Sequence, residues 1–167
     1  MGWSKKSNSV LLDDNLETYL DVLSSKLPFD IMVTSGIRTA RQQALAMFKK
    51  VELGEDLTVT YRDDDFATDM MEAYPDIQKG EQIVKAYFAR GGGSSHQRNM
   101  AIDLRTRDKT QSQIQQMIQA VESLGDYALL EPTPPHLHIT LKKNYQKGNP
   151  SRFLILALIL GAAWMAI

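Results

Sequence analysis

Residues 91–105 read GGGSSHQRNMAIDLR and join a helical pattern to a strand pattern. The preceding segment, Ile77 to Arg90, has helical spacing, and it ends at Gly91-Gly92-Gly93 because a helix does not tolerate three glycines in its interior. From Met100 to Arg105 apolar and polar residues alternate, which is typical of a strand with one buried face. We therefore expect a helix, a glycine-rich turn and a strand in succession.

The rest of the chain repeats these two periodicities. Spacing and composition predict further helices near 11–26, 39–50 and 110–124, and further strands near 30–34, 127–130 and 137–141. The segment 51–75 contains an acidic run with Thr and Tyr residues, and we expect it to be an exposed excursion. This order predicts an α+β fold with a small, largely antiparallel sheet flanked by helices.

Composition restricts the kind of site the chain can build. Its 167 residues, 43% of them hydrophobic, suffice for one domain with one core. The formal net charge of -1, from 19 basic and 20 acidic residues, argues against a nucleic-acid partner, which requires a basic surface. The chain has no cysteine, so any metal ion must be held by His and carboxylate side chains.

The three histidines of the chain, His96, His136 and His138, all lie beside predicted strands or turns. His136 and His138 are two residues apart, so a strand would place both on one sheet face. A catalytic zinc ion takes three protein ligands and keeps a position open for water, and His96, Asp103 and His138 supply such a set. A histidine taken singly is more often an ordinary surface or packed residue, but the combination favours a zinc site on the sheet face.

The stretch Ser94–Asp103, SSHQRNMAID, resembles the S-x-H-x-x-G-x-A-x-D signature of the D-alanyl-D-alanine metallopeptidases. Residues 135–138, PHLH, look like the downstream H-x-H of that family, and residues 33–39, VTSGIRT, are similar to the strand and turn that carry its substrate-binding arginine. The three blocks occur in family order across residues 31–141. The family also includes relatives without peptidase activity, such as the hedgehog signalling domain.

The resemblance implies a zinc peptidase that cuts stem or cross-link peptides of bacterial peptidoglycan, as a D,D-carboxypeptidase or an endopeptidase. It implies that His96, Asp103 and His138 ligate Zn²⁺ and that Arg38 binds a substrate carboxylate or carbonyl oxygen, for which a guanidinium is well suited. Arg38 has an alternative interpretation, in which it caps the following helix or pairs with a surface acid. Ser94 is expected to support the site by hydrogen bonding or to be simple loop polarity.

Two positions depart from the family pattern. Asn99 replaces the signature glycine, which is tolerable because Asn adopts left-handed backbone conformations more readily than most residues. Pro135 stands where one branch of the family has its general base, a glutamate three residues before the last zinc ligand. The base must then come from elsewhere, and the catalytic candidates are His136 and Glu131, with Arg38 assisting at the substrate carbonyl.

The missing glutamate keeps an alternative function open, that of a non-catalytic zinc-containing module that binds cell wall or protein, or of a virion structural protein. We expect the metallopeptidase-like domain to span 1–145, followed by a basic and polar linker over 146–152 and a hydrophobic tail over 153–167. The tail favours membrane association, although a run this short also fits a buried terminal helix. Because no signal peptide is visible and peptidoglycan lies outside the cell, a bacteriophage particle or lysis system is the expected setting.

Overall fold

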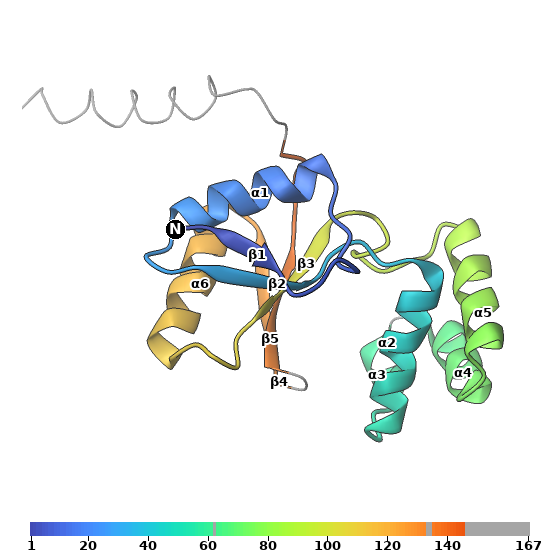
Figure 1. Cartoon of the computed structure of the whole chain (residues 1–167). Helices are drawn as coiled ribbons and strands as arrows, with labels where there is room; N and C mark the ends of the chain where they lie inside the picture. Colours follow the sequence, from blue (N-terminus) through green and yellow to red (C-terminus); the bar gives the residue numbers. More distant parts are fainter. Residues whose placement is uncertain (62, 133–134, 146–167) are drawn as a thin grey trace, which may run out of the picture.

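A mixed five-stranded sheet is at the centre of the molecule in the computed structural model, which describes residues 1–61, 63–132 and 135–145 (Figure 1). The strands are β1 (Trp3–Lys5), β2 (Ile31–Ser35), β3 (Ala101–Arg105), β4 (Tyr127–Pro132) and β5 (Pro135–Thr140). Their spatial order is β1-β2-β3-β5-β4, with β1 parallel to β2 and every other neighbouring pair antiparallel. The predicted α+β class and largely antiparallel sheet are confirmed.

The helices fall into two groups on either side of the sheet (Figure 1). They are α1 (Asp14–Ser25), α2 (Ala40–Glu52), α3 (Leu57–Thr60), α4 (Asp64–Ala73), α5 (Ile77–Ala89) and α6 (Gln111–Ser123). Helices α1 and α6 pack against the sheet, whereas α2 to α5 gather around a second apolar cluster of their own. The predicted helices near 11–26, 39–50, 77–90 and 110–124 correspond to α1, α2, α5 and α6.

The register between β3 and β5 separates a core face from a polar face of the sheet. Ile102 pairs with Ile139 and Leu104 with Leu137, and all four side chains are completely buried in the cluster that contains α1 and α6. Because neighbouring strand residues point to opposite faces, the residues between them point away from this core. Asp103 and the two strand histidines lie at those positions.

The expectation of an exposed excursion over 51–75 is wrong, because the segment contains α3 and α4. Phe66 and Met70, four residues apart on α4, are buried against α2 and α5. The acidic run is solvent-exposed as expected at Asp64 and Asp65, but it begins a helix: the Asp63 carboxylate accepts a hydrogen bond from Phe66 N and caps α4, and Asp64 and Asp65 occupy its first turn. Carboxylates in that position stabilise the positive end of a helix.

The predicted linker over 146–152 and the hydrophobic tail over 153–167 lie outside the residues that the structure describes. Within the described ranges, no helix has both the length and the apolar character needed to cross a membrane. The expected membrane association therefore stays a prediction from the sequence of the tail.

Candidate metal centre

The three predicted metal ligands come together on the polar face of the sheet. Asp103 on β3 and His138 on β5 are direct cross-strand partners, and the turn before β3 brings His96 beside them. One potential ligand atom from each of these residues lies within 4.8 Å of the others. This group of two imidazoles and one carboxylate could hold a metal ion.

The turn that carries His96 depends on the residue that departs from the family signature. Asn99 has a φ of 57°, in the left-handed region that a signature glycine adopts without cost. The turn closes behind it, where Met100 N donates to Ser95 O at 2.9 Å. The sequence-based expectation that Asn99 replaces glycine by adopting this conformation is confirmed.

The His96 ring is buried, and one of its nitrogens is fixed by the backbone. His96 Nδ1 lies 2.7 Å from the carbonyl oxygen of Gly36, and a carbonyl can only accept, so Nδ1 carries a hydrogen. In the neutral ring the other nitrogen, Nε2, is then an acceptor. It has no hydrogen-bond partner among the described residues and lies 3.3 Å from Asp103 Oδ1, which also has only lone pairs to offer.

The contact between His96 Nε2 and Asp103 could also be explained by a protonated ring, but burial disfavours the charged form of His96. Removal from water lowers the pKa of the His96 ring, and the neighbouring Asp103 carboxylate opposes that shift only in part. The neutral ring and the carboxylate thus direct lone pairs at a shared space. A cation between them would satisfy both acceptors, which is the observation that fits this cluster to a metal ion.

The acceptor of the His96 hydrogen bond sits where only glycine fits. A Cβ added to Gly36 would lie 2.3 Å from the backbone oxygen of Leu11, which already accepts a hydrogen bond from Ile37 N at 2.8 Å. The close approach of these two backbone segments fixes the Gly36 carbonyl opposite His96. The sequence shows Gly36 within the VTSGIRT block, but the role of its carbonyl in orienting the His96 ring could not be predicted from it.

Asp103 is the centre of the cluster, and its two carboxylate oxygens have different partners. Oδ2 accepts a hydrogen bond from Arg38 Nη2 at 2.7 Å, while Oδ1 faces His138 Nδ1 at 2.9 Å, His96 Nε2 at 3.3 Å and His136 Nε2 at 3.6 Å. Burial by itself would raise the pKa of the Asp103 carboxyl. The hydrogen bond from His138, the contact with the His96 ring and the positive charge of Arg38 outweigh burial and hold that pKa well below its usual range.

His138 is held on its outer side by a residue that the sequence analysis did not single out. Its Nε2 lies 3.1 Å from Thr140 Oγ1, two positions along the same strand and therefore on the same face. Nδ1 is hydrogen-bonded to Asp103 Oδ1 at 2.9 Å; were a metal ion bound there, Nε2 would donate to the hydroxyl and Nδ1 would present its lone pair to the ion. Each ligand ring is then anchored through its far nitrogen, as is usual for metal-bound histidines. The H-x-H-x-T spacing of residues 136–140 would have indicated that Thr140 lies on the same strand face as the two histidines.

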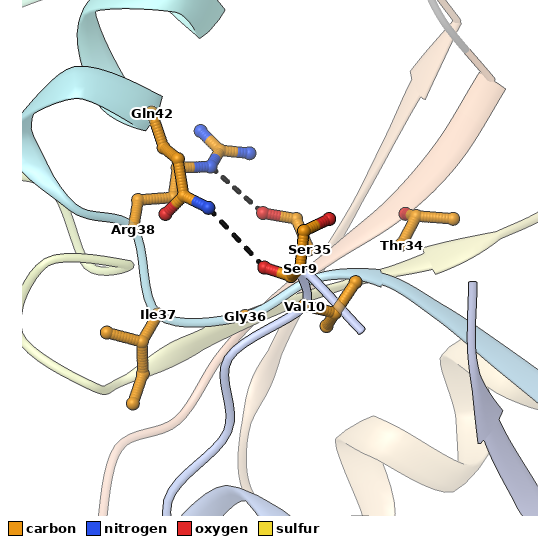
Figure 2. A pocket seen from close by; sticks show the side chains of 8 residues that line it. All are labelled: Ser9, Val10, Thr34, Ser35, Gly36, Ile37, Arg38 and Gln42. Atoms are coloured by element: carbon orange, nitrogen blue, oxygen red, sulfur yellow. Dashed lines mark hydrogen bonds between the residues drawn. The ribbon is translucent and has the colours of Figure 1, made fainter. Parts of the chain in front are cut away.

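Arg38 lies beside the cluster, but two of its nitrogens are engaged within the protein. Its Nε donates to Ser35 Oγ at 2.9 Å, and its Nη2 donates to Asp103. Arg38 therefore pairs with a buried acid, and Thr39, not Arg38, caps α2 with a reciprocal bond to Gln42. Arg38 lines a polar cavity of about 190 Å³ together with Ser9, Ser35 and Gln42. Figure 2 shows the side chains of these residues.

Both candidates for proton transfer lie on the β4–β5 hairpin. Glu131 on β4 is the cross-strand partner of His136 on β5, and Glu131 Oε2 lies 3.7 Å from His136 Nε2. Lys50, at the carboxyl-terminal end of α2, lies 3.6 Å from the same oxygen. The register of the β4–β5 hairpin thus brings Glu131 beside His136. Lys50 has no sequence signal that would have revealed its part in this group.

Ser94 has a structural role next to the cluster. Its hydroxyl donates to Gln43 Oε1 at 3.2 Å, which ties the turn before β3 to the buried Gln43 side chain of α2. The supporting role expected for Ser94 is thus a hydrogen bond between two elements.

Comparison of the chain with protein-family models, curated proteins and solved structures gives no match. The resemblance to D-alanyl-D-alanine metallopeptidases accordingly stays an interpretation of the three sequence blocks, and the cluster is assessed on its own geometry.

Proposed function

We propose that the chain is a zinc-dependent peptidase that hydrolyses peptides of bacterial peptidoglycan. The observation that supports it most is the buried His96 Nε2, an acceptor without a hydrogen-bond partner in the described part of the chain, which faces Asp103 Oδ1 at 3.3 Å. A ring held in this orientation by the Gly36 carbonyl is suited to bind a metal ion. The sequence resemblance supplies the substrate class.

The donor set favours zinc over other common divalent ions. Two imidazole nitrogens and one carboxylate oxygen are the ligands of many catalytic zinc sites, whereas Mg²⁺ and Ca²⁺ prefer oxygen donors throughout. Three protein ligands leave a coordination position open. A zinc ion bound there would supply a Lewis acid for a peptide carbonyl and would make water more acidic.

His136 and Glu131 are our candidates for proton transfer beside this cluster. His136 Nε2 lies between Asp103 Oδ1 and Glu131 Oε2, at 3.6 and 3.7 Å. We assign His136 the role of accepting a proton from the attacking water and returning it to the leaving amine. Glu131 orients the His136 ring and stabilises its charged form, and Lys50 holds Glu131 in place.

Arg38 has a double role in this proposal. Its bond to Asp103 fixes one carboxylate oxygen, so that the other is directed at the two ligand histidines. Its guanidinium also borders the cavity in Figure 2, where it is placed to donate to an oxygen of a bound peptide.

A metal analysis combined with mass spectrometry of digested peptidoglycan tests the proposal. We expect about one zinc per chain and release of stem-peptide fragments or D-alanine. His138→Ala should lose both zinc and activity, whereas His136→Ala should keep zinc and lose turnover. Full zinc occupancy with no cleavage of any peptidoglycan would refute the peptidase and favour the binding module.

We also propose that residues 153–167 attach the enzyme to a membrane near the cell wall, in a phage particle or lysis system. The support is the uninterrupted apolar sequence of the tail after four basic residues, Lys142, Lys143, Lys147 and Arg152. Extraction tests this proposal. The full chain should need detergent, and a chain ending at Lys147 should not; extraction of both without detergent would contradict it.

A further inference from the structure

A second cavity, of about 300 Å³, lies beside Arg38 on the side of α5. Ala40 of α2 and Phe88 and Ala89 of α5 provide apolar surface in its lining, and Arg38 and Lys85 are its two cations. Phe88 is 48% exposed, so its ring is accessible to a ligand in this cavity. No acidic residue belongs to the lining.

This cavity adjoins the metal cluster through two of its residues. Arg38 donates to Asp103 at 2.7 Å, and Gln97, also in the lining, directly follows His96 in the turn. A peptide whose scissile bond reaches the cluster would place neighbouring residues in the cavity, because one extended residue spans about 3.5 Å.

The lining residue Lys85 is ion-paired with an acidic residue that is outside the lining. Lys85 Nζ lies 2.7 Å from Glu81 Oε1, one helical turn away on α5, and Arg41 Nη1 lies 3.4 Å from Glu81 Oε2. A side chain with an aliphatic stem and a terminal amino-acid group matches this arrangement. Its stem would lie on Phe88, its carboxylate would meet Lys85, and its ammonium would meet Glu81.

We infer that this cavity selects peptidoglycan whose third stem residue is diaminopimelate over peptidoglycan with lysine at that place. Diaminopimelate has the aliphatic stem and the terminal amino-acid group, and lysine has a stem and an ammonium but no distal carboxylate. The two peptides thus differ in the one charge that Lys85 complements. The inference rests on the proposed function for its substrate class and adds a specificity site on α5 to it.

The test compares three synthetic tetrapeptides, with diaminopimelate, lysine or diaminopimelate amidated at its distal carboxylate. Their binding is measured by calorimetry on the chelator-treated full chain, which cannot turn them over by a zinc-dependent route. The Lys85 side chain is 65% exposed, so we expect a preference of roughly fivefold for the free carboxylate, as for a partly solvated ion pair. Lys85→Gln should reduce it below about twofold.

Lys79→Gln is the matched control, because Lys79 is exposed on the same helix and does not line the cavity. It should keep the full preference. Equal binding of the three peptides by the unaltered chain, or a preference that survives Lys85→Gln, would overturn the inference. The zinc-loaded chain is assayed for hydrolysis in parallel. A binding preference without hydrolysis would support the specificity of the cavity and refute the peptidase function. Hydrolysis without a binding preference would support the peptidase function and refute the specificity of the cavity.

Discussion

Removal of the Thr140 hydroxyl tests whether the cluster is a metal centre, because that hydroxyl is outside any coordination shell. Thr140→Val keeps the shape of the side chain and deletes the partner that lies 3.1 Å from His138 Nε2. The His138 ring then loses the bond that fixes its orientation and directs Nδ1 toward Asp103. Outer partners of this kind contribute about 10- to 100-fold to metal affinity.

That factor corresponds to about 1.4–2.7 kcal/mol of zinc-binding free energy. The His138 side chain is 17% exposed, so water can replace part of the lost bond, and we expect a value near the lower limit, about tenfold. Competition with a chromophoric chelator at fixed pH measures the affinity. Urea unfolding of the metal-free protein measures stability, which should fall by no more than about 1 kcal/mol.

Thr68→Val is the control, because Thr68 is an exposed threonine on α4 that belongs neither to the cluster nor to the lining of either cavity. It should leave zinc affinity unchanged. Equal affinities of the unaltered chain and Thr140→Val would refute the assignment of His138 Nδ1 as the ligand atom.

Four further outcomes are expected. Gly36→Ala forces the Leu11 backbone away and should cost about 1–3 kcal/mol in urea unfolding as well as zinc affinity, and an unchanged midpoint would contradict the close contact. Asn99→Ala should lose about 1–2 kcal/mol in the same measurement, whereas Asn99→Gly should be near neutral, since only the first strains the left-handed turn. Glu131→Gln should lower kcat about tenfold with zinc content unchanged, and an unaltered kcat would remove Glu131 from proton transfer. Chelation of zinc present at 100 times its Kd should lower Tm by about 5–10 °C in calorimetry without unfolding the chain at room temperature.

The parts of the fold that follow from local patterns could be predicted from the sequence. Alternation gave β3 and β5, and helical spacing with capping residues gave the long helices, because these signals depend on near neighbours. Part of the candidate metal cluster followed from the same alternation. Once the strands that contain Asp103 and the H-x-H pattern pair, these residues lie next to each other on one face of the sheet.

The parts that depend on distant partners could not be predicted. Trp3–Lys5 is only three residues long, and it becomes β1 because it pairs with β2, with Lys6 N donating to Val33 O at 2.8 Å. Helix α4 was not predicted, because its start is acidic and exposed and its apolar residues Phe66 and Met70 become a buried face only against α2 and α5. Lys50 reaches Glu131 across 81 positions of chain, a contact that the sequence does not reveal.

One register between β3 and β5 specifies the apolar core and the polar cluster together. A slip by one residue would turn Ile102 and Leu137 toward water, so the hydrophobic effect selects the pairing in which Asp103 stands opposite His138. Burial of aliphatic side chains on the core face of the sheet thereby determines how far apart Asp103 and His138 lie on the polar face. The chain should consequently fold without a metal ion, and the pairing of Asp103 with His138 is expected to persist in chelator-treated protein.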